Sequence, residues 1–266
     1  MTTRIILHPG FHKTGTSSLQ RGALARAAEL DRHLRLFLKD DLFEATDHSR
    51  RYSRHGGADT LRAFRHSLSS ALAHADTTDP RPILISSEDL SGHLPGKPRI
   101  VDYGAAPVLM GEATAALRDV FGSTSDIDVV FTTRAADPWL RSAYWQILRG
   151  TRYSRDFDTF ARKYRSAADF HRVISQTQKR VGKEVTVHNL PLEACIDDPL
   201  GPLGWVLKTL KIPTGRIAPL PAQNVQPEGA AEEFLALNRS DIDDHTLAET
   251  KRRVYKSYRL KGATRR

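Results

Sequence analysis

The chain has 266 residues, of which 39% are hydrophobic and 27% charged, a composition typical of a globular protein with a sizeable core. A single cysteine, Cys195, excludes an intramolecular disulfide and fits a reducing cytosol. The sequence shows neither a secretory leader nor an apolar run long enough to span a bilayer, so we expect a cytoplasmic protein formed by a single domain over residues 1–266.

The formal net charge of +9 favours anionic partners, which include nucleic acid, anionic lipid and small polyanionic substrates. The basic residues are mostly dispersed along the chain. The exceptions are residues 50–54 and two runs near the C-terminus, 251–253 and 256–266. These runs are consistent either with a solvated surface or with binding of a cofactor or substrate.

Short aliphatic runs alternate with segments of helical periodicity along the chain. The aliphatic runs predict buried parallel strands at residues 5–7, 83–85 and 127–133, and further strands within 32–42 and at 184–187. A helix is expected after the glycine-bearing loop that follows the first strand, and apolar residues at helical spacing predict others at 58–75, 111–120, 137–148, 156–163, 167–181, 204–210, 228–238 and 241–258. Residues 40–57, 91–104 and 212–226 are predicted to be connections, the first of them exposed.

Strands separated by helices imply a parallel sheet covered on both faces, and therefore an α/β protein with three layers, α/β/α. Ligands bind at the carboxyl ends of the strands in such sheets, so Glu88, which follows the strand at 83–85, should emerge beside the end of the first strand. In the helix that follows residue 133, Asp137 is expected to be the cap and Pro138 the first helical residue.

The first strand leads into residues 7–20, which read Leu-His-Pro-Gly-Phe-His-Lys-Thr-Gly-Thr-Ser-Ser-Leu-Gln. Backbone N–H groups in a glycine-bearing loop can converge on one point, and the N-terminus of the following helix adds a partial positive charge. Lys13 adds a full charge, and hydroxyl donors come from Thr14, Thr16, Ser17 and Ser18. The sequence of the loop holds no acidic residue. These features together predict a site for a phosphate or sulfate group.

The loop differs from the nucleotide-phosphate loop at one position. Gly10 and Gly15 have the separation of that motif, but Thr16 stands where the motif requires lysine, and the lysine lies at position 13. The run Lys-Thr-Gly-Thr-Ser-Ser resembles instead the 5′-phosphosulfate loop of sulfotransferases that use 3′-phosphoadenosine 5′-phosphosulfate (PAPS), and it is most similar to the bacterial and carbohydrate-modifying members. The resemblance implies the phosphate-loop-related (P-loop) fold of that family. It also implies that the following residues contact the cofactor: His12, Lys13, Thr14, Gly15, Thr16, Ser17 and Ser18.

A second resemblance lies in the middle of the chain. In these sulfotransferases an arginine at the end of a central strand and a serine on the next helix, with seven residues between them, hold the 3′-phosphate of the cofactor. Arg134 and Ser142 have this spacing and this setting. Arginine offers a forked, permanently charged set of donors to a phosphate dianion, and the serine adds a hydroxyl.

The predicted reaction is in-line transfer of the sulfuryl group of PAPS to an acceptor hydroxyl, which leaves 3′-phosphoadenosine 5′-phosphate (PAP). Lys13 would stabilise the charge on the leaving phosphate oxygen. Glu88 is the expected base, because Ser-Ser-Glu after a strand resembles carbohydrate sulfotransferases, many of which use a glutamate; His93 and His12 are the alternatives. A sulfuryl group carries less negative charge than a phosphoryl group, so no metal is expected, and the sequence offers no His/Cys/Asp cluster with metal-ligand spacing.

Two other functions compete with this interpretation. A P-loop kinase that uses ATP and Mg²⁺ would need a lysine directly after Gly15 and a metal-holding aspartate at a strand end. A non-catalytic binder of anionic polymers would need a basic face with interleaved aromatic residues, whereas the aromatic residues here fall at core-like positions. We therefore expect a small-molecule or carbohydrate acceptor and no nucleic-acid partner. The sequence leaves the acceptor and the oligomeric state open.

Overall fold

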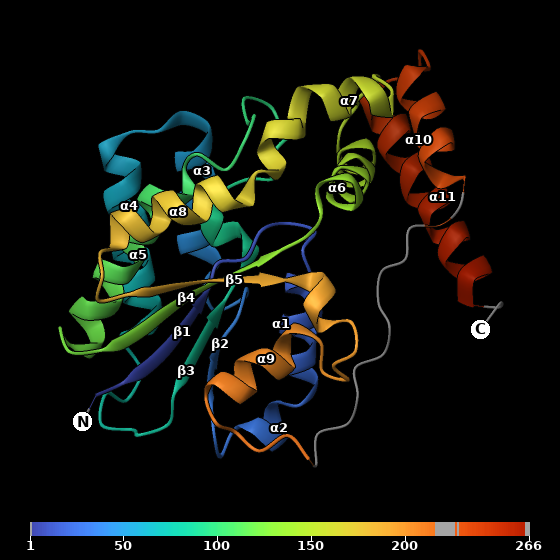
Figure 1. The fold of residues 1–266 in the computed structure, drawn as a ribbon. Coiled ribbons are helices and arrows are strands. Elements are labelled where there is room, and N and C mark those ends of the chain that lie inside the picture. Colours follow the sequence, from blue (N-terminus) through green and yellow to red (C-terminus); the bar gives the residue numbers. More distant parts are fainter. Residues whose placement is uncertain (1, 216–226, 228, 264–266) are drawn as a thin grey trace.

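The computed structural model describes residues 2–215, 227 and 229–263, and its centre is a five-stranded parallel sheet (Figure 1). The strands have the order β2-β3-β1-β4-β5, and every neighbouring pair is parallel. Their bounds are β1, Arg4–His8; β2, Arg35–Phe37; β3, Ile83–Ser86; β4, Asp126–Thr133; and β5, Thr186–Pro191. All five predicted strands are present and helices cover both faces, so the predicted three-layer α/β/α architecture is confirmed.

The sheet separates two hydrophobic cores. Ile5 and Leu7 point into the larger core, and Ile6 between them points into the smaller core, because alternate residues of a strand face opposite sides. The larger core is covered by four helices (Figure 1): α3, Phe43–His55; α4, Ala58–Leu72; α5, Ala106–Phe121; and α8, Phe170–Val181. The smaller core is covered by three: α1, Thr16–Ala25; α2, Ala27–Leu30; and α9, Pro202–Thr209.

Four further helices lie on the side of the sheet where the strands end (Figure 1). They are α6, Ala136–Gly150; α7, Phe157–Tyr164; α10, Ala230–Arg239; and α11, Asp244–Ala263. Trp145 of α6 packs against Phe234 of α10 and Tyr255 of α11, with ring centroids 5.0 Å and 6.4 Å apart. There are also three short 3-10 helices: η1, Glu88–Ser91; η2, Arg165–Ala168; and η3, Leu192–Cys195. Within the described ranges, none of the helices combines the length and the apolar character needed to cross a bilayer.

The prediction that residues 40–57 form an exposed connection is wrong. The segment contains α3, in which Thr46 and Ser49 are buried. This helix packs on η1, where the Ser49 hydroxyl donates a hydrogen bond to the Asp89 carbonyl. Its buried face is made of small and polar residues, so the aliphatic periodicity that marks the other helices is missing here.

The start of α6 also differs from the prediction. The helix begins one residue before Asp137, so Asp137 and Pro138 are its second and third residues rather than its cap and its first. The residue at the N-cap is Ala135, whose N–H donates to Glu193 Oε1 at 2.9 Å. The acceptor comes from a distant segment, which local sequence does not reveal. The connection expected at 212–226 lies outside the described residues from position 216 onward.

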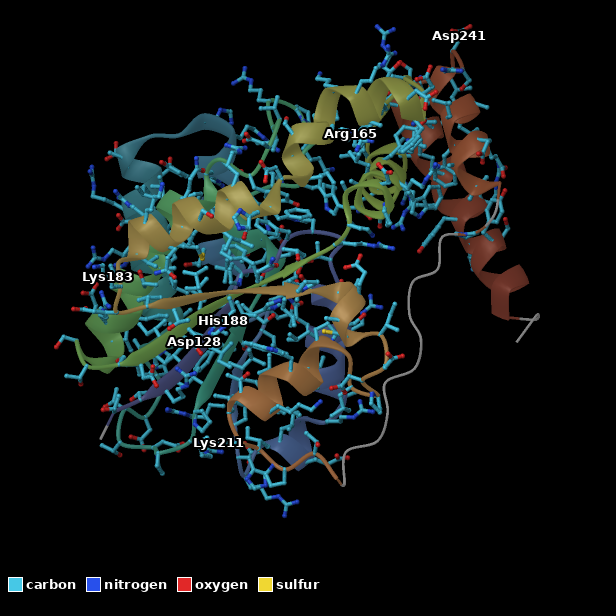
Figure 2. The ribbon with its side chains drawn as sticks, in the orientation of Figure 1. Asp128, Arg165, Lys183, His188, Lys211 and Asp241 are labelled. Carbon is cyan, nitrogen blue, oxygen red and sulfur yellow. The ribbon has the colours of Figure 1, made fainter. Side chains whose placement is uncertain are left out.

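Ion pairs join three strands in the amino-terminal half of the sheet. Asp128 of β4 pairs with Arg4 of β1, and its Oδ2 lies 3.2 Å from Nε2 of His188 in β5; Figure 2 shows Asp128 and His188 on neighbouring strands. Burial raises the pKa of Asp128, but the contacts with His188 and Arg4 outweigh that effect and lower it overall. These charges are satisfied within the fold, and the predicted functional residues gather at the opposite end.

Candidate active site

The loop between β1 and α1 is shaped by three residues with positive φ angles: Gly10 (53°), Lys13 (69°) and Gly15 (98°). Gly15 is the N-cap of α1, and its carbonyl accepts hydrogen bonds from the N–H groups of Ser18 and Leu19. Among the residues that the structure describes, none accepts a hydrogen bond from the backbone N–H groups of residues 13–17. These groups lie at the positive end of α1, so an anion bound there would receive several hydrogen bonds.

A buried chain of polar groups supports the loop on its sheet side. His8, at the end of β1, is fully buried; its Nδ1 lies 2.8 Å from Ser86 Oγ and its Nε2 lies 3.2 Å from Thr132 Oγ1. Thr132 Oγ1 lies 2.9 Å from Thr14 Oγ1, which donates to the Phe11 carbonyl at 2.6 Å. Burial lowers the pKa of His8 to about 3, so the ring is neutral. A proton on Nε2 then gives each donor in the chain an acceptor.

Aromatic side chains hold the other side of the loop. The His12 N–H donates to the Tyr103 hydroxyl at 3.1 Å, and the His12 carbonyl accepts from Trp139 Nε1 at 2.9 Å. Phe11 stacks on Phe131, with ring centroids 4.7 Å apart. Residues from the segment before α5, from α6 and from β4 therefore fix the loop, so its shape exists before any ligand arrives.

Three cations act on one another at this loop: Lys13, Arg134 and Arg149. None of them forms an ion pair with an Asp or Glu among the described residues. Arg149 is held by stacking instead, with its guanidinium carbon 4.1 Å from the ring centroid of Tyr255. Burial, followed by the charges of Arg149 and Arg134, lowers the pKa of Lys13, while the Glu88 carboxylate works in the opposite direction. Clustered cations with too little acid to neutralise them favour an anionic ligand.

Glu88 is the carboxylate that remains accessible beside this loop. Its side chain is 17% exposed at the end of β3, and its Oε1 lies 4.0 Å from Lys39 Nζ. Gln20 of α1 donates to Glu88 Oε2 at 3.1 Å and so orients the carboxylate. The other oxygen, Oε1, forms a long ion pair with Lys39 and accepts no hydrogen bond from the described residues.

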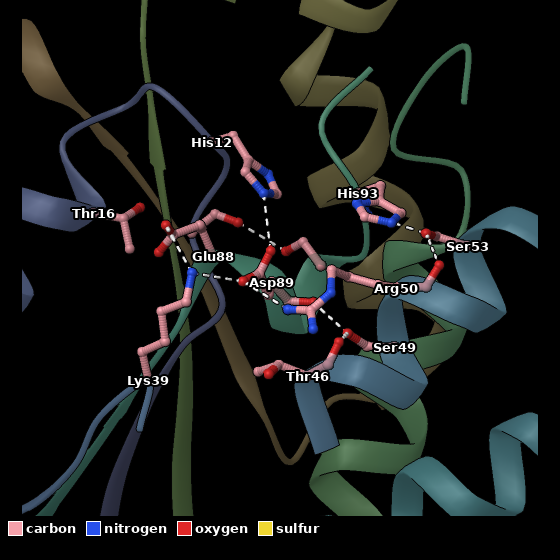
Figure 3. Close-up of polar contacts among 12 residues, drawn as sticks. His12, Thr16, Lys39, Thr46, Ser49, Arg50, Ser53, Glu88, Asp89 and His93 are labelled. Atoms are coloured by element: carbon pink, nitrogen blue, oxygen red, sulfur yellow. Dashed lines mark hydrogen bonds and ion pairs between the residues drawn. The ribbon is translucent and has the colours of Figure 1, made fainter. Parts of the chain in front are cut away.

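The neighbouring Asp89 has a different environment (Figure 3). It is buried and lies within hydrogen-bonding distance of three side chains: His12 (3.2 Å), Lys39 (2.8 Å) and Arg50 (3.0 Å). Burial alone would raise the pKa of Asp89, but the bonds to His12 and Lys39 hold it well below its usual range. The charge of Asp89 is therefore balanced by its partners. Its contacts link Arg50 of α3 and Lys39, which follows β2, to the loop.

The residues predicted to contact the cofactor differ in the groups that they can offer to a ligand. The hydroxyls of Thr14 and Thr16 both donate to the Phe11 carbonyl, so these two residues offer a ligand their backbone N–H groups. Ser17 and Ser18 are partly buried, and their hydroxyls bond to no described residue. Arg134 lies close enough to Lys13 to affect its charge.

Ser142 and the two alternative bases are less directly connected to the loop. No hydrogen bond within the described ranges joins Ser142 of α6 to Lys13 or Arg134. Both ring nitrogens of His12 have partners, because Nε2 lies 3.2 Å from Asp89 and Nδ1 lies 3.4 Å from the Tyr103 hydroxyl. In the described part of the chain, no three His, Cys, Asp or Glu side chains are arranged to hold a metal ion.

Sequence reasoning missed four of these residues: Lys39, Arg50, Asp89 and Arg149. Asp89 directly follows Glu88, and the sequence does not show which of two adjacent carboxylates turns inward. Arg149 follows Ser142 by seven residues, which places both on one face of a helix, so this spacing is a signal that could have found it.

No protein-family model matches the chain, and no curated protein matches its sequence. Among solved structures, a sulfotransferase from Alicyclobacillus acidocaldarius is similar with a TM-score of 0.49 and 15% identity, over 90% of this chain and 92% of that one. A proposed kinase from Chloroflexus aurantiacus is similar with a TM-score of 0.38 and 14% identity, over 79% of this chain and 98% of that one. Likenesses this distant do not assign a function, which has to come from the residues themselves.

Proposed function

We propose that the chain is a sulfotransferase that transfers the sulfuryl group of PAPS to an acceptor hydroxyl. The observation that carries the proposal is the loop after β1, where the N–H groups of residues 13–17 adjoin the cations Lys13 and Arg134, and none of these groups has an acceptor or carboxylate partner among the described residues. This arrangement suits a ligand with two separate anionic groups, one in the loop and one at Arg134. The resemblance of the loop and of the Arg134–Ser142 spacing to PAPS-dependent enzymes supports the same assignment.

The mechanism follows from the charges around the loop. Lys13 and the loop N–H groups would hold the 5′-phosphosulfate, and Arg134 with Ser142 would hold the 3′-phosphate. Lys13 stabilises the negative charge that grows on the phosphate oxygen as its bond to sulfur breaks. Glu88, oriented by Gln20, accepts the proton of the acceptor hydroxyl while the acceptor oxygen bonds to sulfur.

Glu88 suits this role better than either histidine. The ring of His12 is occupied by Asp89 and Tyr103. The Nε2 of His93 accepts a hydrogen bond from Arg54 at 2.9 Å, and burial, followed by the charge of Arg54, lowers the pKa of His93 to about 4. Because the Nε2 lone pair of His93 already accepts from Arg54 and the other ring nitrogen of a neutral imidazole carries the proton, this ring has no free acceptor for the proton of a hydroxyl.

Calorimetric titration with PAP tests the proposal before any acceptor is known. The wild-type protein is expected to bind PAP without added metal. Lys13→Ala and Arg134→Ala should each bind it about ten- to a hundredfold more weakly, because a charge-assisted hydrogen bond contributes about 1.5–3 kcal/mol. Arg141→Ala is the matched control, since Arg141 is exposed on α6 and stacks on Phe157 instead. Failure of the wild type to bind PAP would overturn the proposal, and binding of ATP with Mg²⁺ would then favour a kinase.

Glu88→Gln belongs in the same series because it separates binding from catalysis. Its affinity for PAP should equal or exceed that of the wild type, since a negative charge near Lys13 is removed. Its slow transfer of the sulfuryl group from PAPS to water, measured as PAP release, should fall by at least about 100-fold. Unchanged release would assign proton acceptance to another group.

A further inference from the structure

Two further cations, Arg54 and Lys97, lie near the proposed active site and have no carboxylate partner in the part of the chain that the structure describes. Arg54 is in the last turn of α3, and Lys97 is in the segment between η1 and α5. Both side chains are partly buried, and neither pairs with an Asp or Glu among residues 2–215, 227 and 229–263. The Nε atom of Arg54 is buried and has no acceptor in these ranges.

Arg54 is held in place by a neutral partner. It donates from its NH2 group to His93 Nε2 at 2.9 Å, and the backbone N–H of His93 donates to Ser53 Oγ at 3.0 Å; Figure 3 shows His93 beside Ser53. Because burial and the charge of Arg54 lower the pKa of His93 to about 4, its ring stays uncharged and accepts at neutral pH. Arg54 is therefore oriented without being neutralised, and its other donors remain available.

Lys97 provides a second positive charge, close enough to Arg54 for the two charges to repel each other. It lies against the end of α6, where a Cβ atom on Gly150 would be 3.3 Å from Lys97 Nζ. Burial lowers the pKa of Lys97, and repulsion from Arg54 lowers it further. Arg51 on the same helix shows the contrast, because it is exposed and pairs with Asp47 at 2.8 Å. Two partly desolvated cations that repel each other are unfavourable unless an anion joins them.

The pair borders the proposed active site. Arg50, one helical turn before Arg54, binds Asp89, and Asp89 binds His12 of the phosphate-binding loop (Figure 3). The charges of His12 and Asp89 also act on His93. His93 is also linked to Arg50 through Ser53, whose hydroxyl accepts from the His93 N–H and donates to the Arg50 carbonyl at 2.8 Å.

We propose that Arg54 and Lys97 bind an oxyanion group of the acceptor, so that the acceptor is an anionic hydroxyl compound bearing a carboxylate, sulfate or phosphate group. This inference rests on the proposed sulfotransferase function, because it names the substrate class of the same site. The bound oxyanion fixes one end of the acceptor and so presents a hydroxyl to Glu88. Neutral hydroxyl compounds lack this contact and are expected to be poorer substrates.

Titration with sulfate and acetate tests the inference with defined probes. Saturating PAP is present, so that sulfate does not enter the two phosphate positions of the donor site, and binding at the empty sulfuryl position would not depend on Arg54 or Lys97. The wild type should bind at least one of the two anions, and Arg54→Gln and Lys97→Gln should each bind it about tenfold more weakly, because each loses a charge-assisted contact. Arg51→Gln is the matched control and should bind like the wild type. The anion bound more tightly identifies the group as a carboxylate or as a sulfate or phosphate.

The outcomes separate this inference from the proposed function. Equal binding by the wild type and both variants, or no binding of either anion, would overturn the inference while leaving PAP binding unaffected. If the wild type fails to bind PAP, the sulfotransferase proposal falls, and the anions are titrated into Lys13→Ala, whose loop has lost its charge. Binding in that background that depends on Arg54 and Lys97 would still establish the anion site. Anion binding that is unchanged by substitution of Arg54 and Lys97 in that background would refute the inference.

Discussion

His8 must stay neutral to complete the polar chain beneath the loop between β1 and α1. Burial lowers its pKa from 6.5 to about 3, whereas the unfolded chain keeps the ordinary value. Between these pH values the unfolded state binds the additional proton, so the free energy of unfolding decreases as the pH falls below about 6.5. The loss attributable to His8 between pH 7 and pH 5 should be about 2 kcal/mol. Urea unfolding at the two pH values measures it.

The variant His8→Gln removes this titration and keeps an amide that can still hydrogen-bond. It should be less stable than the wild type at pH 7 but should lose less stability on acidification. His66→Gln, an exposed substitution on α4, should retain the wild-type pH dependence. Asp89 does not contribute to this pH dependence. Because its pKa is lowered in the folded state, its contribution to stability is complete above about pH 4 and is lost only as the pH falls further. Identical pH profiles for the wild type and His8→Gln would show that another group governs acid sensitivity.

The turn from β1 into α1 depends on Gly15 for two reasons. Its φ angle is 98°, and a Cβ atom there would lie 2.7 Å from Leu192 Cδ1 in η3. Gly122, after α5, has a similar φ angle of 92°, but a Cβ atom there would meet nothing within 4 Å. Both alanine variants should therefore lower the free energy of unfolding by about 1–3 kcal/mol through backbone strain. Only Gly15→Ala should also weaken PAP binding, because the clash with Leu192 displaces the start of α1.

Denaturation and PAP titration on both variants provide the comparison. Gly122→Ala controls for the loss of stability, so a selective loss of PAP affinity in Gly15→Ala reports the position of the loop. Equal affinities in the two variants would show that the loop tolerates the displacement.

Elements with aliphatic periodicity were predictable from the sequence, and α3 was not. The strands β1, β3 and β4 each contain an apolar run of three residues, at 5–7, 83–85 and 129–131, which solvent exposure would penalise heavily. Helix α3 is held against a 3-10 helix by Ser49 and Arg50, which both bond to Asp89, an arrangement that depends on tertiary contacts. A single domain over residues 1–266 stays a prediction.

The same distinction applies to the candidate site. Lys13, Glu88 and Arg134 follow strands that run in parallel, so their gathering at one edge followed from topology. The roles of Asp89 and Arg54 depend on which way each side chain turns and on partners from distant segments. No spacing of residues in the sequence reveals which distant side chains become these partners.

At the scale of the whole molecule, the C-terminal helices secure the end of α6. Asn238 of α10 donates to the Tyr153 carbonyl at 2.9 Å, and Lys251 of α11 donates to the Thr151 carbonyl at 2.8 Å. Arg149, near the end of α6, stacks on a tyrosine of α11. The position of one cation at the proposed donor site therefore depends on the last helix of the chain.

Lys251→Met tests this dependence. Burial lowers the pKa of Lys251 to about 8, so the side chain is still an ammonium at pH 7, where it donates to the Leu148 and Thr151 carbonyls at the negative end of α6. Methionine keeps an unbranched side chain that is one atom shorter but leaves the Thr151 carbonyl without this donor, which should lower the free energy of unfolding in urea by about 2 kcal/mol. PAP affinity should fall as well, because the end of α6 that carries Arg149 is loosened. The exposed neighbour Arg252→Met should change neither quantity. A destabilised Lys251→Met protein with unchanged PAP affinity would show that Arg149 keeps its place without α11.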